Sequence, residues 1–251
     1  MRQRLAETRI FWREFRQTFT STGAVLPSGS ALARALARHV TGTRQLDESQ
    51  QEGGELHHQG KNGSPKPNGS PKPKRRILEI GPGTGPVTAK IIQQMGPYDT
   101  LDLVELNERF VSVLKDRLLR DPQWQPVAER IQIHCLPIEE LSAGEPYEVI
   151  ISGLPLNNFS CEMVVAILDR LHQLAAPDAM LSFFEYVAIR KAKSLFCKSP
   201  ERRRLSGIEQ ILAQQLSAWE VDRECVFANV PPAWVHHLRL PGRGRIPCPL
   251  S

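Results

Sequence analysis

Glycine residues dominate one short segment whose composition suits ligand binding. Residues 77–85 read ILEIGPGTG, an apolar strand that runs directly into a glycine-rich turn. Glycine allows the backbone to approach a ligand closely and to adopt angles closed to other residues. The helix expected next offers backbone N–H groups to a polar ligand. The spacing is GxGxG rather than GxGxxG, and no Lys-Ser pair follows, so the turn differs from those of dinucleotide and nucleoside triphosphate enzymes.

Two carboxylates accompany this turn. Glu79 lies at the end of the first expected strand, and Glu105 lies 20 residues beyond Gly85, at the end of the next one. A carboxylate in the second position can accept hydrogen bonds from both hydroxyls of a ribose. The pair of features predicts a nucleoside ligand. Two plainer interpretations stay open: Glu105 as a helix-capping or surface carboxylate before Asn107, and Glu79 as a salt-bridge partner at the strand end.

A second candidate turn follows the fourth expected strand. Residues 151–159 read ISGLPLNNF. Pro155 stiffens this turn and fixes the direction of the neighbouring carbonyl groups, which can then accept hydrogen bonds from a substrate amine. The alternative is a tight connection with no role in chemistry.

Strands and helices alternate from Arg75 onward, which predicts an α/β fold with a mostly parallel seven-stranded sheet and helices on both faces. The expected strands are Arg76–Ile80, Thr100–Glu105, Ile131–Cys135, Glu148–Ser152, Ala179–Tyr186, Trp219–Phe227 and Ala233–Leu240. The expected helices are Pro86–Gln94, Glu108–Arg120, Cys161–Ala175 and Arg202–Ser217. The last two strands have no helix between them, so we expect a C-terminal antiparallel hairpin.

The N-terminal part divides into two expected helices and a linker. Residues 1–20 place aromatic and apolar side chains near one side and five arginines over much of the rest, with a net charge of +3. Such a helix either docks on a membrane surface or packs over the catalytic domain as a lid. A second helix is expected from Pro27 to about Val40. Residues 43–74, which contain a tandem NGSPKP repeat, cannot bury enough apolar surface to order, so we expect a disordered insertion.

The expected organisation is therefore N-terminal helices in residues 1–42, the insertion in 43–74, a catalytic domain in 75–241 and a flexible tail in 242–251. The chain has 251 residues, 41% of them hydrophobic, which suits one sizeable core. A formal charge of +5 favours an anionic partner. The five cysteines are scattered, without metal-ligand spacing, so we expect reduced thiols and no metal. We expect no membrane span or signal peptide and a cytoplasmic protein.

The block LEIGPGTG followed by VEL resembles the class I S-adenosylmethionine-dependent methyltransferases, which share a Rossmann-like fold. The resemblance implies S-adenosyl-L-methionine as the cofactor, its methionine part on the glycine turn and its ribose on the acidic residue. That family often has an acidic residue near the adenine after the third strand, where this chain reads CLPIE. The expected cofactor-binding residues are Glu79, Gly81, Pro82, Gly83, Thr84, Gly85, Glu105, Leu106, Pro137, Ile138, Ser152 and Gly153.

Further strings resemble the bacterial phosphatidylethanolamine N-methyltransferases. They are FWREF, TGAVLPSGSALARAL, SGLPLNN, FFEY and ANVPPAWVHHL, in that order along the chain. The resemblance implies methylation of a phospholipid headgroup amine, towards phosphatidylcholine, at an anionic membrane surface on the inner face of the cell membrane. It places Leu154, Pro155 and Tyr186 at the headgroup, with Arg190, Lys191 or Lys193 near its phosphate. The chain departs from that family in the residue after Tyr186, where glycine is usual, and in its long insertion.

Other functions stay open. The ribosomal RNA adenine dimethyltransferases share LEIGPGTG, the acidic residue on the second strand and an NLPY turn, whereas residues 152–156 of this chain read SGLPL, without that Asn and Tyr. The Tyr stacks a flipped adenine, so nucleic acid is the less favoured partner. A small-molecule amine methyltransferase and a noncatalytic cofactor-binding adaptor are further alternatives.

Overall fold

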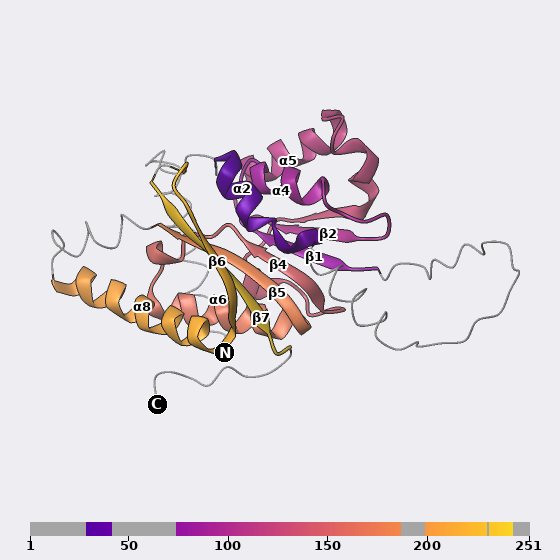
Figure 1. The fold of residues 1–251 in the computed structure, drawn as a ribbon. Coiled ribbons are helices and arrows are strands. Elements are labelled where there is room, and N and C mark those ends of the chain that lie inside the picture. The colour runs from indigo at the N-terminus through magenta and orange to yellow at the C-terminus, as the bar shows by residue number, and fades with distance from the viewer. Residues whose placement is uncertain (1–28, 42–73, 187–198, 230, 243–251) are drawn as a thin grey trace, which may run out of the picture.

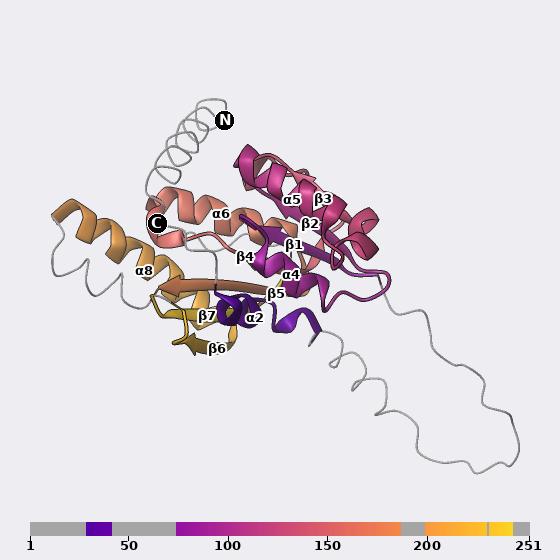
Figure 2. The ribbon, with the colours of Figure 1, turned by 90° about the horizontal axis from the view of Figure 1, so that it is seen from above.

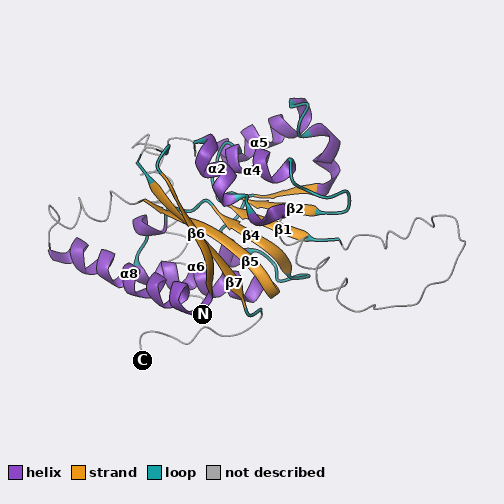
Figure 3. Ribbon diagram, viewed as in Figure 1, coloured by secondary structure: helices purple, strands orange, loops and turns teal. Residues whose placement is uncertain are grey.

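The computed structural model describes residues 29–41, 74–186, 199–229 and 231–242. Its seven strands are β1 (Arg76–Ile80), β2 (Thr100–Val104), β3 (Ile131–His134), β4 (Tyr147–Ser152), β5 (Ala175–Tyr186), β6 (Glu220–Val226) and β7 (Ala233–Leu240). Its α-helices are α2 (Ser30–Leu36), α4 (Pro86–Ile92), α5 (Glu108–Arg120), α6 (Cys161–Leu174) and α8 (Ser199–Trp219). Figures 1 and 3 show the strands crossing the middle of the molecule between two layers of helices.

All seven strands form one sheet in the order β3-β2-β1-β4-β5-β7-β6. Strands β1 to β5 are parallel, whereas β7 is antiparallel to both β5 and β6. The predicted fold is thus confirmed, including the C-terminal hairpin. Because β7 runs backwards along β5, the turn between β6 and β7 lies at the carboxyl edge of the parallel strands, together with the loops that follow β1, β2 and β4.

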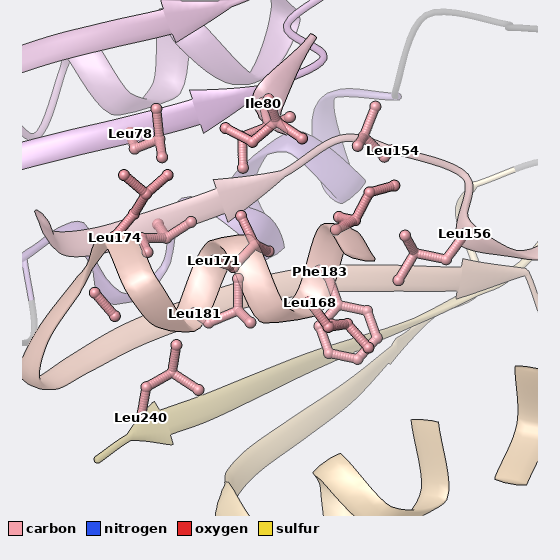
Figure 4. Packing of buried hydrophobic residues seen from close by; sticks show 14 of the residues in the cluster. Leu78, Ile80, Leu154, Leu156, Leu168, Leu171, Leu174, Leu181, Phe183 and Leu240 are labelled. Atoms are coloured by element: carbon pink, nitrogen blue, oxygen red, sulfur yellow. The ribbon is translucent and has the colours of Figure 1, made fainter. Parts of the chain in front are cut away.

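The two faces of the sheet carry separate apolar clusters, as the alternation of side chains along a strand requires. In β1, Leu78 packs with α6 and α8 on one face, and Ile77 packs with α2 and α4 on the other. Figure 4 shows the first of these clusters, with Leu168 and Leu171 of α6 reaching Phe183 and Leu181 of β5. These two clusters therefore fix the sheet between the two layers of helices, and with it the positions of the loops at the ends of its strands.

Several boundaries differ from the prediction. β5 begins at Ala175 rather than Ala179, because Ala175 pairs with Tyr147 ahead of a register shift in the β4–β5 ladder. Asp178, at a φ of 61°, lies within that irregular stretch. α8 extends to Trp219, so β6 begins one residue later than predicted. The end of a helix and the start of the strand that follows it are hard to separate by pattern alone when no glycine or proline divides them, as between α8 and β6.

The first described segment packs onto the rest of the fold. α2 contacts α4 and the strands β5, β6 and β7, and Figure 2 shows it lying beside β7. The side chain of Asn229, in the turn after β6, accepts a hydrogen bond from the backbone N–H of Gly29 at 3.2 Å. The expected second helix is thus present over Ser30–Leu36. The expected amphipathic helix in 1–20 and nearly all of the insertion in 43–74 lie outside the described residues, and so does most of the tail.

Candidate cofactor and acceptor site

The glycine turn lies between the ends of β1 and β2. Gly81 donates its N–H to the carbonyl of Val104 at 2.9 Å, which joins the turn to the neighbouring strand. Three glycines adopt positive φ, namely 69° at Gly81, 58° at Gly83 and 87° at Gly85. L-residues with side chains rarely adopt this region. The sequence thus specifies the turn locally, because glycine occupies each position that needs it.

The three glycines have different surroundings. A Cβ on Gly85 would lie 2.7 Å from the ring of Trp124, and a Cβ on Gly81 would lie 2.9 Å from the side chain of Leu154. A Cβ on Gly83 would meet nothing within 4 Å. Gly81 and Gly85 are therefore needed for packing inside the protein as well as for their backbone angles. The space beside Gly83 is the part of the turn that is open to a ligand.

Glu105 ties this turn to the end of β2. Its carboxylate accepts hydrogen bonds from the N–H of Gly83 at 3.0 Å and from the N–H of Asn107 at 2.8 Å. The side chain is almost buried, and burial raises its pKa, although the same N–H groups oppose that shift. Each carboxylate oxygen has a further lone pair, so the group can still accept hydroxyl hydrogens from a ribose. The open space at Gly83 and this acceptor next to it fit the expected cofactor.

Glu79 has a different environment from the one its strand-end position suggests. It is 1% exposed, and its carboxyl accepts a hydrogen bond from the hydroxyl of Thr88 at 2.6 Å. Burial raises the pKa of Glu79 to about 8, and the nearby charge of Glu105 adds to the shift. Among the described residues it forms no salt bridge. The group is therefore a neutral acid near pH 7, and it adds no negative charge beside Glu105.

We expect this buried acid to make stability depend on pH. The folded protein keeps the proton of Glu79 up to about pH 8, whereas an unfolded chain loses it near 4.5. Folding then binds a proton within that window, so the free energy of unfolding decreases as pH rises from 4.5 to 8. Glu79→Gln should remove this contribution, and its melting temperature relative to the wild type should rise with pH. Thermal unfolding at several pH values measures this, with the exposed Glu108→Gln as control. A constant difference between Glu79→Gln and wild type would contradict it.

The turn after β4 packs directly against the glycine turn. Gly153 donates its N–H to the carbonyl of Ile80 at 2.7 Å, and a Cβ on Gly153 would lie 2.7 Å from the carbonyl oxygen of Gly81. Ser152 is buried, and its hydroxyl accepts a bond from the N–H of Leu154 at 3.4 Å. The structure thus brings the two predicted turns together. The glycine at position 153 is required by this close approach of two backbones.

The next residues of that turn are held from α8. The guanidinium of Arg204 donates to the carbonyls of Asn157, at 2.9 Å, and Phe159, and it also pairs with Glu201. Leu154 and Leu156 are buried in the cluster shown in Figure 4, whereas Pro155 is half-buried. Sequence analysis missed Arg204, as it missed Thr88, because each acts on residues of another element and neither belongs to a recognisable motif.

The remaining predicted residues surround the same edge. Thr84 is exposed, Pro82 is buried, and Leu106 is half-buried against the α6 side of the sheet. Pro137 is half-buried, whereas Ile138 is 2% exposed, so its side chain belongs to the core.

Tyr186 lies on the other face of the sheet from Leu154. Its ring packs edge-on against Phe184 at 5.0 Å between centroids, in the cluster that contains α2 and α4. Of the three predicted acceptor-site residues, Leu154 and Tyr186 therefore reach the carboxyl edge from opposite faces of the sheet. Arg190, Lys191 and Lys193 lie outside the described residues.

Comparisons with known proteins agree with this geometry. Residues 67–232 match the ribosomal RNA adenine dimethylase family. A malonyl-[acyl-carrier protein] O-methyltransferase of Bacillus cereus is 30% identical over 137 residues, which cover 53% of this chain and 46% of that protein. An ornithine lipid N-methyltransferase of Singulisphaera acidiphila is 25% identical over 104 residues, 41% of this chain and 54% of that protein. This chain thus spans about half the length of these two relatives.

A solved structure from Klebsiella pneumoniae assigned as an O-methyltransferase superposes with a TM-score of 0.50 at 16% identity, covering 66% of this chain and 73% of that one. The fold is that of the class I S-adenosylmethionine-dependent methyltransferases. Within that class, the chain belongs to the ribosomal RNA adenine dimethylase family.

Proposed function

We propose that this protein transfers a methyl group from S-adenosyl-L-methionine to the amine of a phospholipid headgroup, of the phosphatidylethanolamine type, at an anionic membrane surface. The observation that carries the proposal is an exposed aromatic side chain at the same edge of the sheet as the site. Phe227 is 79% exposed in the turn after β6, at the carboxyl edge of the parallel strands. Aromatic rings at the rim of a site favour the boundary between lipid headgroups and acyl chains.

The surroundings of Phe227 support a membrane-facing edge. Trp234, at the start of β7, is 37% exposed, and the guanidinium of Arg223 lies over its ring at 5.5 Å. The side chain of Asn229 joins this turn to Gly29, the first residue that the structure describes. An arginine beside an aromatic ring suits a surface of lipid phosphates over apolar chains. The ornithine lipid N-methyltransferase among the relatives acts on a lipid, as its name states.

Family membership favours a second candidate, the methylation of adenine in RNA. That reaction needs a base to be turned out and stacked on an aromatic ring. The turn after β4 has leucine at position 156, which is 3% exposed, and its aromatic residue, Phe159, is fully buried. This turn therefore offers no accessible ring for stacking. The observation favours a small aliphatic amine over a nucleobase.

The chemistry of the proposal asks mainly for alignment. The bound cofactor supplies a methyl group on a positively charged sulfur, which is already a good leaving group. Held at the glycine turn by Gly83 and Glu105, the cofactor would offer this methyl carbon to the amine nitrogen, and the electron pair of the broken carbon–sulfur bond would stay on sulfur. An ammonium headgroup must first give a proton to water or a base. In this proposal, backbone carbonyls of the turn that contains Leu154 and Pro155 accept hydrogen bonds from the resulting amine.

The decisive experiment offers both acceptors at once. The full chain is incubated with methyl-labelled cofactor, vesicles of phosphatidylethanolamine and phosphatidylglycerol, and ribosomal RNA, and the label is then measured in each fraction. We expect label in the lipid fraction. Label in RNA alone would replace the lipid proposal by the adenine one, and label in neither would contradict both.

We expect Phe227→Ala to weaken binding to anionic vesicles by roughly tenfold or more, because burying a phenylalanine ring contributes about 1.5 to 3 kcal/mol. Vesicle sedimentation measures the loss. Tyr98→Ala is the matched control, because Tyr98 is 55% exposed just before β2, at the opposite edge of the sheet. Equal losses in the two variants would show that the hairpin turn has no special contact with lipid.

A further inference from the structure

Three potential metal ligands meet far from one another in sequence. They are His39, just after α2, Asp222 on β6 and His237 on β7, and one ligand atom from each lies within 4.8 Å of the other two. We propose that these residues bind a divalent transition-metal ion of the zinc type, which fastens the α2 segment to the β6–β7 hairpin. The site is separate from the glycine turn and from the turn after β4.

His237 gives the strongest evidence that a ligand belongs here. Its ring is buried, at 0% exposed, and its Nε2 has no hydrogen-bond partner. The other ring nitrogen, Nδ1, lies 2.8 Å from the hydroxyl of Ser182 on β5. A buried polar atom without a partner is costly, so native proteins rarely contain one without a reason. Metal-binding histidines commonly use one nitrogen for the ion and the other for such a supporting hydrogen bond.

The distance between two of the three ligands fits a tetrahedral ion. The Nε2 of His39 lies 3.5 Å from a carboxylate oxygen of Asp222. Two ligands at about 2.0–2.1 Å from a tetrahedral zinc ion lie roughly 3.4 Å apart. The rings of His39 and His237 lie 4.4 Å apart between centroids. Two imidazoles and one carboxylate suit zinc, cobalt, nickel or copper better than magnesium or calcium.

The partly exposed ligands leave an entrance for the ion. The side chains of His39 and Asp222 are 24% and 37% exposed, which also leaves room for water as a fourth ligand. Arg38 lies on the same side, 3.2 Å from the Asp222 carboxylate and 3.7 Å from that of Glu224. An incoming cation competes with Arg38 for Asp222, and Glu224 can keep the displaced guanidinium. Arg38 should therefore weaken the affinity of the site for metal.

Cobalt binding to the full chain tests the proposal. The protein is stripped with a chelator and titrated with Co²⁺, whose visible spectrum reports a tetrahedral site, and then with Zn²⁺ in competition. All variants carry His57→Ala and His58→Ala, which remove the adjacent histidine pair of the sequence. We expect one tight equivalent in this background, with affinity reduced tenfold or more by His39→Gln or Asp222→Asn. Arg38→Gln should bind more tightly than its parent.

Each outcome bears on the site directly. Cobalt binding that is lost in the His57→Ala/His58→Ala background, or unchanged by His39→Gln and Asp222→Asn, would overturn the proposal. Both ligand variants change partly exposed side chains, so they should fold, and melting without metal checks this. Zinc should raise the melting temperature of the parent but not of the two ligand variants, because it stabilises only the folded state that binds it. Equal shifts in all of them would also overturn it.

Discussion

Gly83→Val is expected to abolish binding of S-adenosyl-L-methionine, with a loss of affinity of at least about 100-fold. The valine side chain would occupy the one part of the glycine turn where a Cβ meets no protein atom within 4 Å. It would also have to adopt a φ of 58°, which strains a β-branched residue. Calorimetric titration with S-adenosylhomocysteine measures the affinity. Gly83→Asn separates the two effects, because asparagine tolerates that φ but still fills the space.

The matched control for this change is Gly144→Val. Position 144 lies in the loop before β4. The nearest atom to a Cβ there would be in the guanidinium of Arg76, at 3.6 Å, which is an ordinary van der Waals contact. That variant should bind the cofactor like the wild type. If both Gly83 variants fold and keep normal affinity, the space beside Gly83 is not the cofactor site, and the proposed function loses its basis.

Glu105→Ala should weaken the binding of the cofactor by about 1.5 to 3 kcal/mol, or roughly 10- to 150-fold in affinity. The loss has two sources in the structure. The ribose hydroxyls lose their acceptor, and the N–H groups of Gly83 and Asn107 lose the carboxylate that orders the turn. Glu105→Gln should give a smaller loss, because its amide oxygen replaces one acceptor and its NH₂ group cannot replace the other.

Glu108→Ala removes the same charge from an exposed position three residues away and serves as the control. The dependence on pH gives a second measurement. The affinity of the wild type for the cofactor should fall as the pH is lowered, because protonated Glu105 loses acceptor capacity. Since the pKa of Glu105 is raised, this fall should begin at a higher pH than for an ordinary glutamate, and Glu105→Gln should lack it. Wild-type affinity in Glu105→Ala would exclude the assigned ribose contact.

The membrane proposal and the metal proposal depend on different residues of the same hairpin. The first depends on Phe227 in the turn between β6 and β7, and the second on Asp222 and His237 within these strands, together with His39. No helix among the described residues is both long and apolar enough to cross a bilayer. Neither experiment depends on the outcome of the other.

The sequence by itself determined the cofactor turn and the order of strands and helices. The turn is recognisable because its requirement is local: glycine stands at each position with positive φ, directly between an apolar strand and a helix. Glu105 was predictable from a rule of similar reach, since neighbouring parallel strands end at the same edge and the ladder pairs Ile80 with Val104. Hydrophobic periodicity predicted most helices and strands, because the spacing of apolar residues within a short segment shows which face of that segment is buried.

Only the tertiary structure decided features that depend on neighbours distant in the chain. Glu79 became a neutral acid because burial beside Thr88 excludes water, whereas the sequence predicted a cofactor-binding residue, with a salt bridge as the alternative. Gly153 is explained by the carbonyl of Gly81, which reaches it from another strand. The meeting of His39, Asp222 and His237 has no spacing signature at all, because folding alone brings one helix and two strands together. Local backbone demands can be read from short segments, whereas burial, protonation and ligand geometry arise from contacts that no segment contains.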